Sequence, residues 1–99
     1  MFNFEKLDVW QERFGLTNQM RSAAVSISSN LAEGSSRVSR IDFARFVEIA
    51  TGSLFEVVSQ STIALRRKII TQNDYNRIYA AAEKQSKMLS ELCRALFEP

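Results

Sequence analysis

The sequence has 99 residues, 45% of them hydrophobic and 24% charged, with a net charge of +2. This length and composition predict one globular domain over residues 1–99 and exclude two domains or a disordered chain. Histidine is absent and Cys93 is the only cysteine, which excludes disulfides, histidine or paired-cysteine metal sites and Ser-His or Cys-His catalysis. We therefore expect a protein that is not an enzyme and uses no cofactor or metal.

The sequence also predicts a cytoplasmic location. No apolar run approaches the roughly 20 residues of a membrane span, and the first residues lack the basic and apolar regions of a signal peptide. The lone thiol fits a reducing compartment.

The predicted elements are all helices, because Pro99 is the only proline and helix-forming residues occur throughout. The first dozen residues, with Phe4 and Trp10, are expected to form a stub that docks on the other helices. A first full helix is predicted from an N-cap at Thr17 to a C′ residue at Gly34. Its apolar positions, spaced by 4, 3 and 4 residues, are Met20, Ala24, Ile27 and Leu31.

Two longer helices are predicted to follow. Ser39 can cap the second helix with Asp42 three residues on, and this helix is expected to continue to about Ile70. Thr71 and Asp74 form a further capping box, and the last helix continues to the C-terminus. Both helices repeat their apolar positions every 4 and 3 residues, a pattern typical of packed helix pairs. These positions are Phe43, Val47, Ala50, Leu54, Val57, Ser61 and Ala64, then Tyr75, Ile78, Ala82, Gln85, Leu89, Leu92 and Leu96.

Two residue types inside the second helix have further implications. Gly52, followed by Ser53, costs helix stability and predicts a point of close contact between helices. Phe43, Phe46 and Phe55 have the spacing of core residues, so no exposed aromatic side chain for stacking on bases is expected. The short loops make neighbouring helices antiparallel, and the predicted class is all-α.

Five stretches of the chain form a recognisable series. They are Phe4-Glu5-Lys6-Leu7-Asp8-Val9-Trp10, Gly15-Leu16-Thr17-Asn18-Gln19-Met20-Arg21-Ser22-Ala23-Ala24-Val25-Ser26-Ile27, Asn30-Leu31-Ala32-Glu33-Gly34, Asp42-Phe43-Ala44-Arg45-Phe46 and Ile49-Ala50-Thr51-Gly52-Ser53-Leu54-Phe55-Glu56. In this order they closely resemble the four-helix-bundle family named after proteins encoded in intervening sequences of bacterial 23S ribosomal RNA genes. The resemblance implies an antiparallel up-and-down four-helix bundle, a ring-shaped homo-oligomer that is typically a pentamer, and binding of ribosomal RNA or other nucleic acid. It implies no catalytic activity.

The chain departs from this family pattern in one place. Family members have a long first helix between the Val-Trp start and the Glu-Arg-Phe-Gly-Leu-Thr segment, whereas here Trp10 and Gln11 adjoin Glu12 and Arg13. Either the first helix is truly shortened, or the natural protein contains a stretch that this sequence lacks. A real deletion exposes the apolar seams of the other helices, which requires self-association.

A polar stripe on the predicted first full helix is a candidate oligomer interface. Its residues are Gln19, Ser22, Ser26, Ser29, Asn30 and Glu33. Short hydroxyl and amide side chains allow close helix approach, although a solvated face explains the same pattern. Glu33 lies at the negative end of the helix dipole, so we expect it to pair with Arg37, Arg40 or Arg21.

Two groups of cations are candidate nucleic-acid contacts. The first is expected to gather around the turn after Gly34 and consists of Arg13, Arg21, Arg37, Arg40 and Arg45. The second ends the second helix and consists of Arg66, Arg67 and Lys68. Arginine forks suit phosphate oxygens. Ion pairing with Glu33, Asp42 and Glu48 within the chain is the alternative explanation of the first group, and stabilisation of the helix C-terminus is that of the second.

The leading hypothesis is a non-enzymatic, oligomeric helical bundle that binds structured RNA, ribosomal RNA above all, through arginine patches. The alternative is an assembly scaffold that binds no nucleic acid. The salt dependence of binding separates the two, because only phosphate contacts weaken steeply as salt rises.

Overall fold

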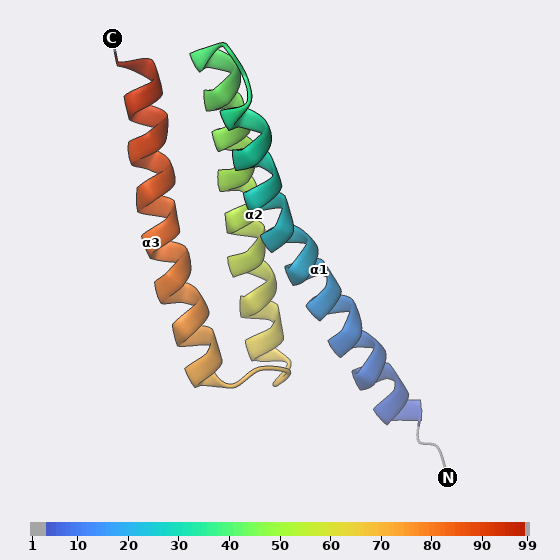
Figure 1. The fold of residues 1–99 in the computed structure, drawn as a ribbon. Helices are drawn as coiled ribbons and strands as arrows, with labels where there is room; N and C mark the ends of the chain where they lie inside the picture. The colour runs from blue at the N-terminus through green and yellow to red at the C-terminus, as the bar shows by residue number, and fades with distance from the viewer. Residues whose placement is uncertain (1–3, 99) are drawn as a thin grey trace.

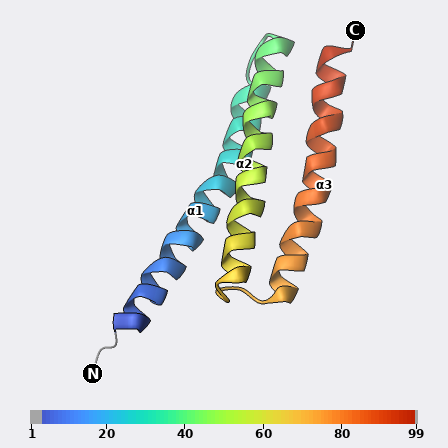
Figure 2. The same ribbon diagram turned by 180° about the vertical axis from the view of Figure 1, so that it is seen from behind.

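The structure is a computed structural model that describes the backbone of residues 4–98 and the side chains of residues 15, 16 and 18–98. Three helices follow one another: α1 (Phe4–Ser35), α2 (Arg40–Arg66) and α3 (Gln72–Phe97). Successive helices run antiparallel, and the N-terminal part of α1 extends beyond the turn that joins α2 to α3 (Figures 1 and 2). The predicted all-α class with antiparallel packing is confirmed, and the described residues contain three helices.

The helix α1 differs most from expectation. It begins at Phe4 and runs without interruption to Ser35, so the predicted start at Thr17 is wrong. A Cβ atom added at Gly15 would meet nothing within 4 Å, and one exposed glycine costs only about 1 kcal/mol relative to alanine. The two segments that meet at Trp10–Arg13 therefore form one continuous helix. The predicted docking of the first dozen side chains lies outside the described residues.

Gly34 does not end α1 as a left-handed C′ residue. The glycines have no positive φ, and the helix continues to Ser35. A Cβ atom at Gly34 would lie 2.8 Å from Phe46 Cβ and 2.9 Å from Phe43 Cδ1. Glycine is therefore required at this position by the close approach of α1 to the start of α2.

The predicted caps of the other helices are present. Asp42 N donates to Ser39 Oγ at 3.3 Å at the start of α2, and Thr71 and Asp74 form a reciprocal capping box on α3. α2 ends at Arg66, short of the predicted Ile70, because Lys68 has a left-handed backbone with φ of 60°.

The core follows the predicted seam of α2 but contains small side chains. Buried residues on this seam are Val47, Ala50, Leu54, Ser61 and Ala64. The first three form one hydrophobic cluster with Ala82 and Leu89 of α3. The largest fully buried side chains are Val47 and Ser61. Gly52, in contrast, is exposed, and an added Cβ would meet nothing within 4 Å. The close contact predicted there involves Ser53 alone, whose hydroxyl lies 2.9 Å from that of Ser26.

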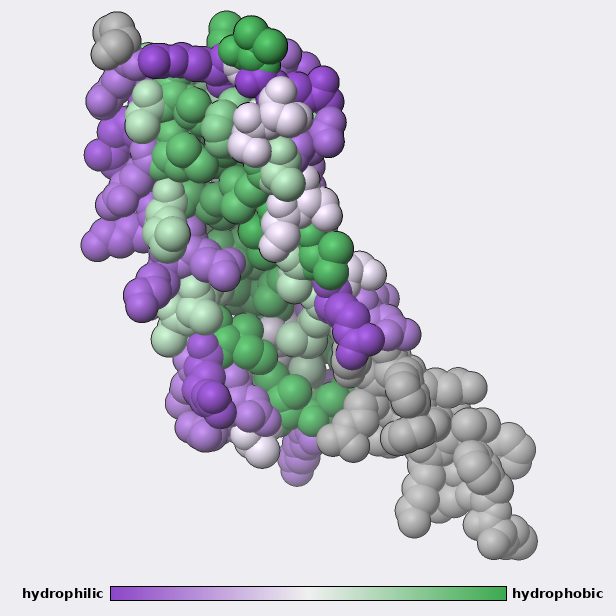
Figure 3. All heavy atoms as spheres, in the orientation of Figure 1, coloured by the Kyte–Doolittle hydropathy of each residue, from purple (hydrophilic) through white to green (hydrophobic). Residues whose placement is uncertain are grey.

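One side of the molecule is open. Within the described residues the backbones of α1 and α3 each lie close to α2 along its length and not close to each other. Hydrophobic residues form a band between α1 and α3, and hydrophilic residues gather along its outer edges (Figure 3). The radius of gyration is 16.7 Å, whereas a compact chain of this length has about 13 Å.

Candidate nucleic-acid interface

The candidate cations divide between the two ends of α2. Arg37, Arg40 and Arg45 lie in or near the turn that joins α1 to α2, while the group Arg66–Lys68 lies at the C-terminal end of α2. The two ends are about 40 Å apart, because α2 has 27 residues with a rise of about 1.5 Å each.

Arg13 and Arg21 do not gather at the first turn, as the sequence had predicted. Both lie on the continuous helix α1, so Arg21 is about 20 Å and Arg13 more than about 30 Å from the turn along the helix axis. The side chain of Arg21 is exposed, and that of Arg13 lies outside the described ones.

In the first turn, Arg37 and Arg40 form contacts within the chain. Arg37 Nη2 donates to Glu33 Oε1 at 2.7 Å, which confirms the predicted ion pair. The guanidinium of Arg37 also lies over the ring of Phe46, 5.0 Å from its centroid. Arg40 Nη1 donates to the carbonyl oxygen of Glu98 at 3.0 Å. Arg45 is exposed on the outer side of α2.

The position of the second group of cations is set by the backbone conformation at the end of α2. The Lys68 N–H donates to Leu65 O at 3.0 Å, and the Ile69 N–H donates to Ala64 O at 2.8 Å. These bonds and the left-handed residue at Lys68 define a Schellman motif, in which glycine is the usual residue. Arg66 and Lys68 are exposed and form no ion pair with a side chain that the structure describes. Because Lys68 occupies a left-handed position that favours glycine, it is a candidate for function.

Part of the polar stripe on α1, which is the predicted oligomer interface, forms hydrogen bonds within the chain. Gln60 Nε2 donates to Gln19 Oε1 at 3.3 Å, and Asn30 Nδ2 donates to Ser26 Oγ at 3.0 Å. The bond between Gln60 and Gln19 and the bond between Ser26 and Ser53 join α1 to α2, whereas the Asn30 bond lies within α1. Ser22 and Ser29, together with Glu33, remain exposed. The interface role of this stripe stays a prediction.

Exposed aromatic side chains are present, contrary to the sequence-based expectation. Phe55 is 63% exposed and Tyr79 is 46% exposed, and both line a hollow at the contact between α2 and α3. Phe55 follows buried Leu54 directly, so it points about 100° away around the helix. The apolar spacing of α2 did not distinguish this position from the true seam.

The part of the chain that the structure describes contains no group of three or more histidine, cysteine, aspartate or glutamate residues able to hold a metal ion. Within the same residues, each helix is too short or too polar to cross a membrane. The candidate site therefore consists of the two cationic ends of α2, which are joined by the helix itself.

These observations define an all-α protein of antiparallel helices with exposed cations at both ends of its central helix. The sequence model of the 23S rRNA-intervening sequence protein family matches residues 5–91, and the chain belongs to this family. No curated protein matches the chain. The match extends across the junction at Trp10–Arg13, where the family pattern expected from the sequence is shortened.

Proposed function

We propose that this chain is a non-enzymatic, self-associating helical protein that binds structured RNA, ribosomal RNA above all, through phosphate contacts from the two cationic ends of α2. Membership in a family named after intervening sequences of 23S rRNA carries the proposal. The exposed arginines and lysine at both ends supply the donors that phosphate oxygens accept from.

The geometry supports contacts with the RNA backbone rather than readout of bases. The cations lie on turns and helix ends about 40 Å apart, so they match separate phosphates along a folded RNA better than one base step. Self-association places several copies of these cationic ends in one assembly. Several weak phosphate contacts then act together on one RNA.

Salt titration tests the proposal. We expect the affinity for a structured 23S rRNA fragment to fall as a power of the salt concentration, with an exponent that counts the neutralised phosphates. Binding that does not respond to salt, or no binding, contradicts the proposal.

Matched variants then locate the contact. Two triple variants remove three charges from one end each, Arg37→Gln with Arg40→Gln and Arg45→Gln, or Arg66→Gln with Arg67→Gln and Lys68→Gln. The control removes three charges from exposed positions of α3, Arg77→Gln with Lys84→Gln and Lys87→Gln. We expect both end variants to weaken RNA binding and to lower the salt exponent, while the control changes neither by as much. If all three variants lose RNA affinity equally, the assignment of the RNA contacts to the two ends of α2 is wrong.

The alternative function is an assembly scaffold without nucleic-acid binding, and the apolar band between α1 and α3 favours it (Figure 3). A scaffold predicts that the chain self-associates and retains no RNA at any salt concentration.

A further inference from the structure

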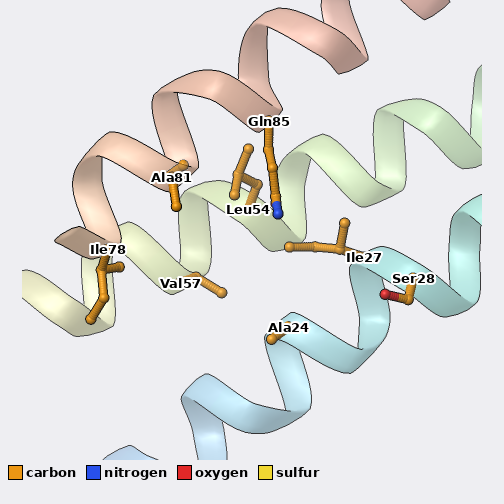
Figure 4. Close-up of a pocket in the computed structure, with 9 residues that line it drawn as sticks. Ala24, Ile27, Ser28, Leu54, Val57, Ile78, Ala81 and Gln85 are labelled. Atoms are coloured by element: carbon orange, nitrogen blue, oxygen red, sulfur yellow. The ribbon is translucent and has the colours of Figure 1, made fainter.

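Two hollows of different chemistry lie on either side of the contact between α2 and α3. Leu54 and Ala82 are buried at this contact and line both hollows. The first hollow lies between α1 and α3, and its described side chains are aliphatic, hydroxyl and amide groups without an aromatic ring (Figure 4). The second hollow is formed by α2 and α3 and is bordered by the rings of Phe55 and Tyr79. Of the two, the second therefore offers aromatic faces to a ligand.

The rings of the second hollow are exposed and supported by neighbouring side chains. Tyr79 contacts the ring of Tyr75, whose centroid lies 6.0 Å away. The hydroxyl of Tyr75 lies 3.2 Å from that of Thr62 on α2, so Tyr75 is held in place in turn. Phe55 and Tyr79 are both exposed, and an aromatic ring has few rotatable bonds to order on binding. Such rings can bind a flat ligand at little cost in conformational entropy.

The polar groups of this hollow are acceptors rather than cations. Glu83 and Ser86 line it together with the two rings, and the described part of its lining contains no lysine or arginine. The carboxylate of Glu83 repels a phosphate, whereas the amino group of a base donates a hydrogen bond to a carboxylate. The hollow therefore suits the base of a nucleotide and excludes its phosphate.

The hollow also lies in line with the second cationic end of α2. Arg66 follows Phe55 by eleven residues, which is about three helical turns, so the two share one face of α2. They are about 16 Å apart along the helix axis, and stacked nucleotides of one strand are spaced by about 3.4 Å. A strand whose phosphate contacts Arg66 therefore reaches Phe55 within about five nucleotides.

We propose that Phe55 and Tyr79 form a stacking site for an unpaired base of the RNA whose phosphates contact the cationic end at Arg66. Stacking uses the π-face that every base has. Glu83 accepts a hydrogen bond from the amino group of the base, so cytosine is preferred to uracil, which carries a carbonyl oxygen at the corresponding position. The proposal rests on the proposed function for its phosphate contact. It deepens that function, because it names an unpaired, amino-bearing base beside a structured region as the part of the RNA that the protein selects.

The first test compares three RNA hairpins that share one stem. One ends without a tail, one carries a single-stranded tail of cytidines, and one carries an equal tail of uridines. We expect the cytidine tail to raise the affinity about tenfold and to bind about threefold more tightly than the uridine tail, although both tails carry the same phosphates.

Glu83→Gln should remove the difference between the two tails, because an amide both donates and accepts hydrogen bonds. The matched control is Glu91→Gln, which removes the same charge from an exposed position of α3 outside the hollow. It should leave the preference for cytidine unchanged.

The second test separates stacking from apolar contact. Phe55→Leu keeps an apolar side chain but removes the ring, and we expect it to weaken binding of the cytidine-tailed hairpin about tenfold. Phe55→Trp keeps a ring and should retain the affinity. Neither variant should change the salt exponent, whereas Arg66→Gln should lower it by about one. Met88→Leu is the matched control, because Met88 is also 63% exposed and lies outside the hollow. Circular dichroism checks the helical content of each variant.

Three outcomes overturn the proposal: a tail that adds no affinity, equal binding of the cytidine and uridine tails by the wild-type chain, or wild-type affinity in Phe55→Leu. The last result leaves the apolar face of a protein as the occupant of the hollow.

The failure of the proposed function is a separate result. Binding that requires the tail and the ring of Phe55 but does not respond to salt supports stacking and contradicts the phosphate contacts. Salt-dependent binding that is indifferent to Phe55 does the reverse. If the chain binds none of the hairpins, both proposals are wrong.

Discussion

The two turns of the bundle place cations in different ways. In the first turn the ion pair of Arg37 with Glu33 and the contact of Arg40 with Glu98 use the cations within the chain, and Gly34 fixes the approach of α1 to α2. In the second turn a Schellman motif ends α2, and Lys68 occupies a left-handed position that favours glycine. The first turn therefore engages Arg37 and Arg40 within the chain, while Arg66 and Lys68 of the second turn are exposed.

The largest expected effect tests the packing of the first turn. Gly34→Ala should lower the free energy of unfolding by about 1 to 3 kcal/mol, because the new Cβ meets Phe46 Cβ at 2.8 Å. Gly52→Ala is the matched control, since nothing lies within 4 Å of its Cβ position. It should raise the free energy of unfolding by about 1 kcal/mol through helix propensity.

Urea unfolding at one fixed protein concentration measures both glycine variants, because self-association makes stability depend on concentration. Changes of the same sign in the two variants contradict the account of Gly34.

The next effect separates the two turns by their affinity for RNA. Arg66→Gln with Lys68→Gln should weaken binding about tenfold, and Arg37→Gln with Arg40→Gln about threefold, because the latter pair is already engaged within the chain. Binding isotherms at one salt concentration measure both. The reverse order shows that the first turn, not the second, carries the contact.

A smaller effect concerns Lys68 alone. Lys68→Gly should raise the free energy of unfolding by about 1 kcal/mol, because glycine adopts φ of 60° without a steric penalty. The same variant should weaken RNA binding by about twofold. A variant that gains stability without losing RNA affinity removes Lys68 from the RNA contact.

The smallest effect concerns Glu33. Glu33→Gln breaks an ion pair whose side chains are 44% and 54% exposed, so the free energy of unfolding should change by less than about 0.5 kcal/mol. Released from this pair, Arg37 should bind RNA more strongly, by about twofold. Titration of the variant with the same RNA fragment checks this, and a weaker complex contradicts it.

Much of the fold could be predicted because its signals are local. The caps at Ser39 and Thr71 satisfy helix N–H groups within three residues, and the seam of α2 gives the buried positions directly. The role of Gly34 could not be predicted, because a helix-ending glycine and a close-packing glycine look alike until α2 is placed beside it. The continuity of α1 through Thr17 could not be predicted for a related reason. Threonine is compatible both with an N-cap and with the interior of a helix, and the sequence does not distinguish the two.

The candidate site was predictable only in part. The pair between Glu33 and Arg37 follows from their spacing of four residues. The separation of Arg13 and Arg21 from the first turn depends on the length of α1, and the exposure of Phe55 depends on where α3 packs. The apolar band between α1 and α3 could not be located from the sequence, because the 4 and 3 spacing of α3 does not show that α1 leaves one side of α3 uncovered.

The most direct test of the central claim, that the cationic ends of α2 bind RNA, is native mass spectrometry of the purified protein with and without total bacterial RNA. The account predicts an assembly that carries RNA at low salt and loses it as the salt concentration rises. An assembly that remains free of RNA at low salt contradicts it.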